Sequence, residues 1–243
     1  MFYGADQAGI HDREFGKLAG FAAADLLQLL SSGGHPTGTV VDLGCGSGLL
    51  ARVVTDAGYD VVGVDISPDM VALARQHAPR AEFTVGSLHD FRLPEGCVAV
   101  TATGEALNYG AGMASVARLA ERVVDALVAG GVFLFDVAGP GRAGSTGSTR
   151  QFHRRDDWCL GMIATESEQG GRLDREITIF VSEDDGRYRR VDEHHVLRLY
   201  DRDALASLLT EAGLVVNVLD DYRSPTTHPK IPGWYVVEAK KPR

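Results

Sequence analysis

The sequence predicts an α/β fold built on a doubly wound, mostly parallel sheet. The first observation is that short apolar runs alternate with amphipathic segments between residues 39 and 139, which is the pattern of successive βαβ units. The second is that these runs are apolar throughout, as strands buried on both faces are. The third is a change of pattern at residues 157–200, where longer segments are separated by the hairpin dipeptides Gly170-Gly171 and Asp185-Gly186.

Apolar runs predict the strands in the order in which they occur. Residues 39–43, TVVDL, form the first run, and a glycine-rich turn follows it directly. Residues 139–150 are also rich in glycine and predict a linker to three antiparallel strands. Parallel strands are expected at 39–43, 59–65, 81–86, 97–103 and 132–139, antiparallel strands at 157–168, 172–183 and 188–200, and the last two strands at 214–221 and 233–241.

Helical spacing of apolar residues predicts the helices, and cap residues predict their ends. Ser67 is the expected N-cap of one helix, and Pro68 suits its first turn. Gly58 and the pair Gly130-Gly131 are expected to end two others. Helices are expected over residues 12–31, 49–58, 67–79, 113–131 and 201–213.

Composition excludes several classes of protein. The chain has 243 residues with 24 basic and 33 acidic side chains, a formal net charge of −9 that disfavours nucleic-acid binding. Its three cysteines, Cys45, Cys97 and Cys159, have no metal-ligand spacing, so neither a disulfide scaffold nor a metal site is expected. No apolar run is long enough to span a bilayer, and the first residues do not resemble a signal peptide, so we expect a cytoplasmic protein without membrane contact.

The sharpest chemical signal is a glycine-rich loop between the first strand and the next helix. The segment Asp42-Leu43-Gly44-Cys45-Gly46-Ser47-Gly48 allows a tight turn and a closer approach to a ligand than a Cβ would permit. Asp65 ends the following strand, and the carboxyl ends of adjacent parallel strands face one crevice. Because an acid there can accept both hydroxyl protons of a ribose, the two features indicate an adenosine-containing cofactor.

Two cofactors compete for this loop. Gly46, Gly48 and Ala51 formally fit the dinucleotide fingerprint G-x-G-x-x-G/A, which would indicate an NAD(P)-dependent oxidoreductase. Asp42 argues against it, because a carboxylate beside the pyrophosphate would repel that charge. S-adenosylmethionine carries an amino group and a sulfonium instead, which a carboxylate attracts. A protein that binds S-adenosylmethionine or S-adenosylhomocysteine without catalysis would keep the same residues and is the other alternative.

These segments resemble the class I S-adenosylmethionine-dependent methyltransferase superfamily, closely over residues 39–139 and more loosely over the C-terminal third. Residues 42–48 look like its first motif, residues 62–67 like its second, and residues 129–136 like the Gly-Gly turn into its fifth strand. A local resemblance of residues 136–142 and 193–195 is to small-molecule methyltransferases related to amino-sugar N-methyltransferases. The resemblance implies a Rossmann-like sheet of seven strands with an antiparallel last strand, and a β insertion that covers the active site.

The resemblance also implies which residues form the site. Ser87 stands where the family commonly has an acid that binds the adenine amino group, and a neutral hydroxyl makes a weaker hydrogen bond there. The residues after the fourth strand are expected at the substrate: Glu105, Asn108 and Tyr109, with Arg142 from the linker. Cofactor-binding residues are expected to be Asp42, Gly44, Cys45, Gly46, Gly48, Asp65, Ile66, Ser87, Leu88, Thr103 and Gly104.

Methyl transfer is an in-line displacement at the sulfonium carbon, in a cleft from which water is excluded. A neutral amine acceptor needs little beyond positioning, whereas a hydroxyl or a carbon acid needs a base. His195 and His153 are the base candidates. His195 could equally be a strand histidine packed on leucines, and His153 could lie in a solvated loop. Arg142 could recognise an anionic group of the acceptor or belong to a flexible loop.

We therefore predict a methyltransferase that converts S-adenosyl-L-methionine to S-adenosyl-L-homocysteine and methylates a nitrogen, oxygen or carbon of a small molecule. One domain is expected over residues 1–243, and a homodimer is a further expectation. Its expected parts are an N-terminal helical lid over 1–38, a cofactor-binding core over 39–139, a linker and antiparallel cover over 140–200, and a C-terminal helix with the last two strands over 201–243.

Overall fold

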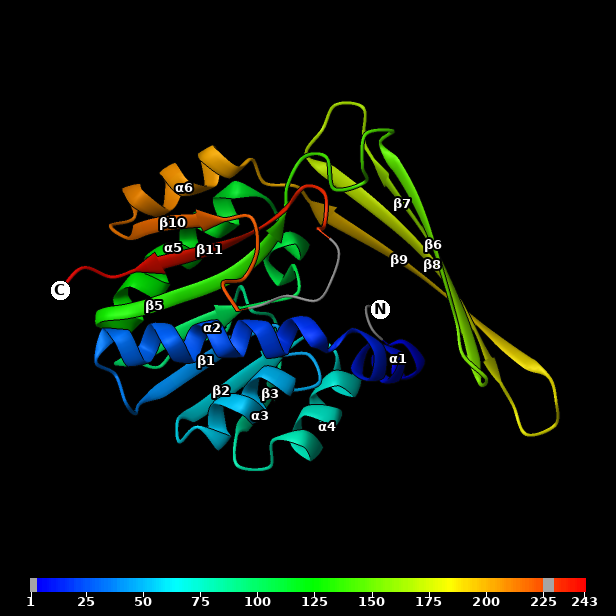
Figure 1. Cartoon of the computed structure of the whole chain (residues 1–243), viewed down its shortest axis with the longest axis horizontal. Helices are drawn as coiled ribbons and strands as arrows, with labels where there is room; N and C mark the ends of the chain where they lie inside the picture. The colour runs from blue at the N-terminus through cyan, green and yellow to red at the C-terminus, as the bar shows by residue number, and fades with distance from the viewer. Residues whose placement is uncertain (1–3, 225–229) are drawn as a thin grey trace.

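The computed structural model describes residues 4–224 and 230–243, which form two sheets (Figure 1). The larger sheet has seven strands in the order β10-β11-β5-β4-β1-β2-β3. Neighbours from β3 to β5 are parallel, and β11 is antiparallel to both β5 and β10, so the predicted fold is confirmed. The strands are β1 (Thr39–Leu43), β2 (Asp60–Asp65), β3 (Glu82–Val85), β4 (Cys97–Ala102), β5 (Leu127–Ala138), β10 (Val215–Leu219) and β11 (Trp234–Lys240).

Helices cover both faces of this sheet, because successive side chains of a strand point to opposite faces. Val41 packs in one core and Val40 in the other, and both are fully buried. The first core is closed by α5 (Met113–Ala126) and α6 (Arg202–Glu211), the second by α2 (Lys17–Gly33), α3 (Leu49–Asp56) and α4 (Pro68–His77). As predicted, Ser67 caps α4, and its side chain accepts a hydrogen bond from the Met70 N–H.

The smaller sheet stands beside the end of the larger one toward which β5 points (Figure 1). It is antiparallel in the order β6-β7-β8-β9, so it has four strands where three were predicted. The strand absent from the prediction, β6 (Ser148–Arg154), begins within the segment predicted as linker. The others are β7 (Trp158–Glu166), β8 (Arg172–Ser182) and β9 (Tyr188–Arg198).

Two predicted helices have different bounds in the structure. The helix predicted over 12–31 is two helices, α1 (Ala5–Phe15) and α2, separated at Gly16, where an added Cβ would collide with the Leu49 side chain. The helix predicted over 113–131 ends at Ala126, because Leu127 already pairs with Cys97 in the sheet. None of the described helices is long and apolar enough to cross a membrane.

Candidate functional site

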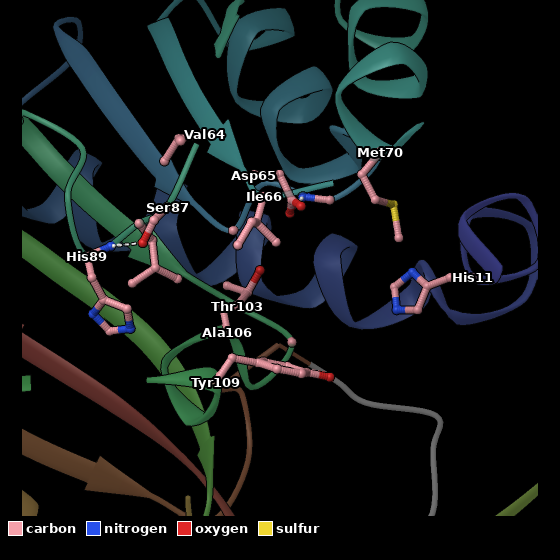
Figure 2. A pocket seen from close by; sticks show the side chains of 14 residues that line it. His11, Val64, Asp65, Ile66, Met70, Ser87, His89, Thr103, Ala106 and Tyr109 are labelled. Carbon is pink, nitrogen blue, oxygen red and sulfur yellow. Dashed lines mark hydrogen bonds between the residues drawn. The ribbon is translucent and has the colours of Figure 1, made fainter. Parts of the chain in front are cut away.

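A cavity lies at the carboxyl ends of β1, β2, β3 and β4 (Figure 2). Its walls come from the loops that follow these strands, from α1 and from the short 3-10 helix η1 (Ala106–Tyr109). This is the edge where doubly wound sheets bind their ligands. Nine residues predicted for the site line it: Gly44, Gly46, Asp65, Ile66, Ser87, Leu88, Thr103, Gly104 and Tyr109.

The glycine loop has room for an added side chain where it faces the cavity, but not where it packs against the rest of the protein. Gly44, Gly46 and Gly48 all have positive φ, which glycine adopts without strain. A Cβ on Gly44 would lie 2.7 Å from the Ala106 Cβ, and one on Gly48 would lie 2.8 Å from the Ala74 Cα. A Cβ on Gly46 would meet no atom within 4 Å. Substitution would therefore push the loop apart at two positions and fill the cavity at the third.

Asp65 ends β2 and fixes the loop from the side. Its Oδ2 accepts the Gly46 N–H at 2.9 Å, and its Oδ1 accepts the Ser67 N–H at 2.9 Å. Burial raises the pKa of this carboxyl group, and the hydrogen bonds from Ser67 and Gly46 oppose that effect. Each carboxylate oxygen has a second lone pair, so Asp65 can still accept hydrogen bonds from the two hydroxyls of a ribose. Ile66 beside it is 60% exposed, which leaves an apolar face for a planar ring.

Asp42 lies beneath the loop and does not line the cavity. It is 1% exposed, and its Oδ1 accepts the Thr101 hydroxyl at 2.7 Å, between β1 and β4. Burial raises the pKa of Asp42 to about 6, and the hydrogen bond from Thr101 opposes the rise. Cys45 and Gly48, which were also predicted to touch the cofactor, are likewise outside the cavity lining. Asp42 therefore acts on the site through the two strands that it joins.

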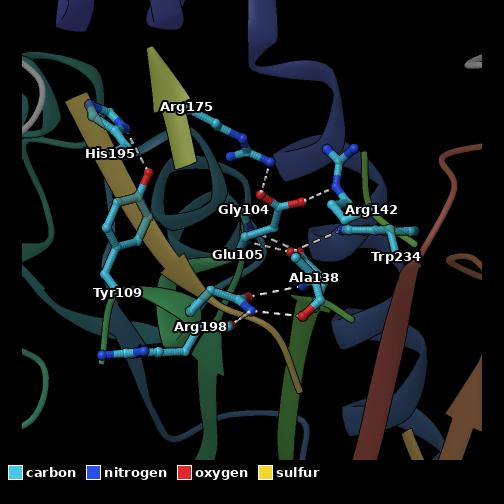
Figure 3. Close-up of polar contacts among 11 residues, drawn as sticks. Gly104, Glu105, Tyr109, Ala138, Arg142, Arg175, His195, Arg198 and Trp234 are labelled. Atoms are coloured by element: carbon cyan, nitrogen blue, oxygen red, sulfur yellow. Dashed lines mark hydrogen bonds and ion pairs between the residues drawn. The ribbon is translucent and has the colours of Figure 1, made fainter. Parts of the chain in front are cut away.

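Glu105 is held away from the cavity by two arginines (Figure 3). Its Oε1 accepts from Arg142 Nε at 2.7 Å, and its Oε2 accepts from Arg175 Nη2, on β8, at 2.6 Å. Burial alone would raise the pKa of Glu105, but Arg175 and Arg142 outweigh it and lower this pKa to about 2. Its φ of 61° is the one positive value of a non-glycine residue among the described residues. The pairs bind the loop after β4 to the linker and to the smaller sheet.

Asp136 belongs to two of the segments that resemble the family but was not predicted as a site residue, and it fixes the same loop from below. It lies within the buried run of β5, and its oxygens accept hydrogen bonds from the backbone N–H groups of Gly104 at 2.9 Å and Glu105 at 2.7 Å. The hydroxyl of Tyr222 donates to it at 2.6 Å, and the Trp234 ring N–H at 3.3 Å. The signal that could have identified Asp136 is its place in the apolar run FLFDVAG, which predicts a buried position. A buried carboxylate needs several hydrogen-bond donors around it.

Asn108 is buried and cross-links the backbone. Its Nδ2 donates to the carbonyls of Ala138 and Arg198 at 2.8 and 2.5 Å, and its Oδ1 accepts the Ala138 N–H at 3.0 Å. Both amide hydrogens are used in these contacts, so the prediction that Asn108 binds substrate is not supported by its position. Arg142 is also outside the cavity lining, because it is turned to Glu105.

The two histidines predicted as bases have different places. His195, on β9, is 1% exposed, and its Nδ1 lies 2.9 Å from the hydroxyl of Tyr109, which lines the cavity. His153 lies on the edge strand β6 and is outside the cavity lining. Five lining residues were not predicted: His11, Val64, Met70, His89 and Ala106. Three of them are chain neighbours of predicted residues, whereas His11 and Met70 reach the cavity from α1 and α4. Among the described residues, no cluster of His, Cys, Asp or Glu side chains is arranged to hold a metal.

Comparison with known proteins agrees with this geometry. The family described as "Methyltransferase domain" matches residues 40–131, which carry the glycine loop and Asp65. A Geobacillus sp. (strain WCH70) protein named as a methyltransferase is 30% identical over 187 residues, 73% of this chain and 74% of that one. The dTDP-3-amino-3,6-dideoxy-alpha-D-glucopyranose N,N-dimethyltransferase of Streptomyces fradiae is 27% identical over 210 residues, 81% and 78% of the two chains.

Solved structures share the fold over almost the whole length of the chain. An S-adenosylmethionine-dependent methyltransferase from Clostridium acetobutylicum ATCC 824 has a TM-score of 0.82 at 18% identity, over 97% of this chain and 98% of that one. DesVI of Streptomyces venezuelae has a TM-score of 0.78 at 23% identity, over 99% of this chain and 100% of that one.

The space beside Gly46, the free lone pairs of Asp65 and the exposed face of Ile66 fit the amino acid part, the ribose and the adenine of S-adenosylmethionine. Its cationic sulfonium also suits a site with two buried acids better than a pyrophosphate would. The oxidoreductase is therefore not favoured. The non-catalytic binder is not favoured either, because the matching relatives are named as methyltransferases. The chain belongs to the S-adenosylmethionine-dependent methyltransferases.

Proposed function

We propose that the chain transfers a methyl group to the nitrogen of an amino sugar. The observation that carries this proposal is the length of the likeness to the amino-sugar N,N-dimethyltransferase of Streptomyces fradiae. A match over 81% of the chain extends well beyond the cofactor-binding core, into the segments that would contact an acceptor. Residues 103–106, Thr-Gly-Glu-Ala, also lack an Asn-Pro-Pro-Tyr-type motif, which disfavours methylation of planar amide or nucleobase nitrogens.

The residues of the cavity would divide between the two reactants. We assign Asp65 to the ribose, Ile66 and Leu88 to the faces of the adenine, and the loop Gly44–Gly48 to the amino acid part of the cofactor. When bound, the cofactor supplies a methyl group on a cationic sulfur. Tyr109 and α1, on the opposite side, would hold the acceptor and keep water out, and a neutral amine needs little more.

A direct test uses dTDP-3-amino-3,6-dideoxy-α-D-glucopyranose as acceptor, with the matched sugar nucleotide that has a hydroxyl in place of the amine as control. We expect one or two methyl groups to be added to the amine, detected by mass spectrometry, with one S-adenosylhomocysteine released for each. The hydroxyl control should stay unchanged. Binding of S-adenosylmethionine without transfer to the amine would contradict the proposed acceptor and favour the non-catalytic alternative.

Other features remain predictions from the sequence. These are the cytoplasmic location, the homodimer, the lack of nucleic-acid binding and the division of a single domain at residues 38, 139 and 200. Gel filtration with light scattering measures the oligomeric state.

A further inference from the structure

Three side chains form a continuous path from the cavity wall into the smaller sheet. Tyr109 lines the cavity, and its hydroxyl oxygen lies 2.9 Å from Nδ1 of His195 (Figure 3). On the same strand, Nε2 of His195 lies 2.9 Å from Oε2 of Glu193. Residues two apart on a strand share a face, so His195 and Glu193 both point toward η1 and α1. The path joins a group in the cavity to a buried carboxylate.

The carboxylate of Glu193, at the buried end of this path, determines which nitrogen of His195 carries the hydrogen. Glu193 accepts hydrogen bonds from α1 and its N-cap: from the backbone N–H of Gly4 at 3.0 Å, and from the Gln7 amide, whose nitrogen faces Oε1 at 2.8 Å. A carboxylate has only acceptor atoms, so the imidazole nitrogen that faces it carries the hydrogen. In neutral His195 the lone pair is then on Nδ1, and the Tyr109 hydroxyl donates to it.

Glu193 is the carboxylate that can stabilise a positive charge on His195. Arg175 is the cross-strand neighbour of His195 on β8, and its guanidinium is turned to Glu105. His11, on α1, is partly buried, and burial lowers its pKa to about 4, with Asp12 opposing this effect and His195 adding to it. His11 is therefore neutral near pH 7, and a proton that arrives on His195 meets the carboxylate of Glu193 at 2.9 Å.

We propose that Tyr109, His195 and Glu193 form a proton relay that removes a proton from the acceptor's ammonium group before methyl transfer. The proposal rests on the amine acceptor proposed above. An ammonium nitrogen has no lone pair and cannot attack. Its N–H bond breaks as the proton moves to the Tyr109 oxygen, and the hydroxyl hydrogen of Tyr109 moves to Nδ1 of His195. The electron pair stays on the acceptor nitrogen, and the imidazolium is stabilised by Glu193 until it gives its proton to water.

The relay is tested by the pH dependence of Tyr109→Phe and His195→Gln. Phenylalanine keeps the ring of Tyr109, and glutamine keeps both hydrogen-bonding positions of His195 but takes up no proton. Without the relay, only acceptor that is already neutral in solution can react. We expect kcat/KM for the amino sugar to fall about 100-fold at pH 7 in both variants, the size typical of acid–base catalysis. The loss should shrink as the pH rises toward the pKa of the acceptor amine.

Three controls make the result specific. Tyr188→Phe, at an exposed position on the same strand, should match the wild type. Affinity for S-adenosylmethionine, measured by calorimetry, should be unchanged in Tyr109→Phe and in His195→Gln. An acceptor with a weakly basic amine, neutral at pH 7, should show little loss. If His195→Gln does not fold, Tyr109→Phe alone decides the question.

Two outcomes would overturn the relay. One is a loss of kcat/KM that is the same at every pH and for both acceptors, which would show that the side chains only shape the site. The other is no loss at all, which would show that the proton goes directly to water. If the wild type binds S-adenosylmethionine but methylates no amino sugar, the proposed function itself fails, and that result is distinct from both.

Discussion

At the scale of single residues, the two acids of the glycine loop have different tasks. Both were predicted to touch the cofactor, but only Asp65 lines the cavity. Asp42 spans β1 and β4 through Thr101. The sequence places both acids at strand ends, but a shift of one position along a strand turns a side chain to the other face. The contacts of Asp42 could therefore not be read from the motif.

Substitution of Asp65 should weaken cofactor binding selectively. Asp65→Asn removes the charge that accepts hydrogen bonds from the ribose, and loss of one such contact costs about 1–3 kcal/mol. We expect calorimetry to show weaker binding of S-adenosylmethionine by this amount. Asp60→Asn, at the exposed start of the same strand, is the matched control and should bind as the wild type does. Equal affinity in both variants would remove the ribose assignment.

Asp42 makes stability depend on pH in an unusual direction. Its pKa is raised from 3.8 to about 6, so the folded protein holds this proton more tightly than the unfolded chain. Its ionisation therefore costs stability as the pH rises from about 4 to about 6, by roughly 3 kcal/mol for a pKa difference of this size. Asparagine does not ionise, so Asp42→Asn should not lose stability in this way. We expect urea unfolding to show that the free energy of unfolding of the variant rises relative to that of the wild type between pH 4 and pH 7. A difference between the two that is the same at every pH would contradict this.

At the scale of elements, Glu105 is the point where three segments meet. The loop after β4, the linker and β8 are joined through one carboxylate and two guanidinium groups. A segment that ends in such a cluster cannot move independently, because separating a buried ion pair leaves a charge without its partner. Residues 139–150 were predicted as a glycine-rich linker, and this cluster together with β6 restrains them at both ends.

Glu105→Gln should destabilise the fold by about 3–5 kcal/mol, because it leaves two arginines without a counter-charge. The pKa of Glu105 is lowered to about 2, so its contribution is complete above pH 4.5 and is lost as the pH falls toward 2. Urea unfolding at pH 7 and at pH 3.5 measures both effects. Glu176→Gln, at the next and exposed position of β8, should change stability by less than about 0.5 kcal/mol. Equal losses at the two pH values would argue against the ion pairs as the cause.

The sequence predicted most elements because they bury a regular apolar pattern. It failed for β6, whose residues Ser148–Arg154 are mostly polar and lie at a sheet edge. That strand exists because its backbone pairs with β7, and no side-chain pattern records such pairing. The predicted end of the helix over 113–131 was wrong for a related reason, since pairing of Leu127 with β4 outweighs the helical pattern.

At the scale of the whole molecule, the sequence predicted the part of the cavity formed by loops at the strand ends better than the part formed by segments that pack over them. Gly44, Gly46 and Asp65 belong to one continuous βαβ unit, so their spacing along the chain fixes their spacing in the fold. His11 was not predicted and reaches the cavity through the packing of α1. His195 was predicted as a base candidate, but its contact with Tyr109 depends on how the smaller sheet packs. Asp136 and Glu193 stand in segments that the sequence analysis compared with the family, but only their hydrogen bonds indicate what they do.

Cofactor binding should stabilise the whole chain. A ligand that binds only the folded state at 100 times its Kd adds about 2.7 kcal/mol to the free energy of unfolding. We expect S-adenosylmethionine to raise the melting temperature accordingly and a nicotinamide dinucleotide to leave it unchanged. Differential scanning calorimetry with each compound gives the comparison, and stabilisation by the dinucleotide alone would contradict the assigned cofactor.

The position of β11 determines when the larger sheet can be completed. This strand is the last in the sequence but lies inside the sheet, between β10 and β5. Until residues 234–240 have left the ribosome, the six other strands remain as a five-stranded piece with an open edge at β5 and a separate β10. A chain interrupted before residue 234 would thus leave β5 and β10 with exposed edges, which chaperones and proteases recognise.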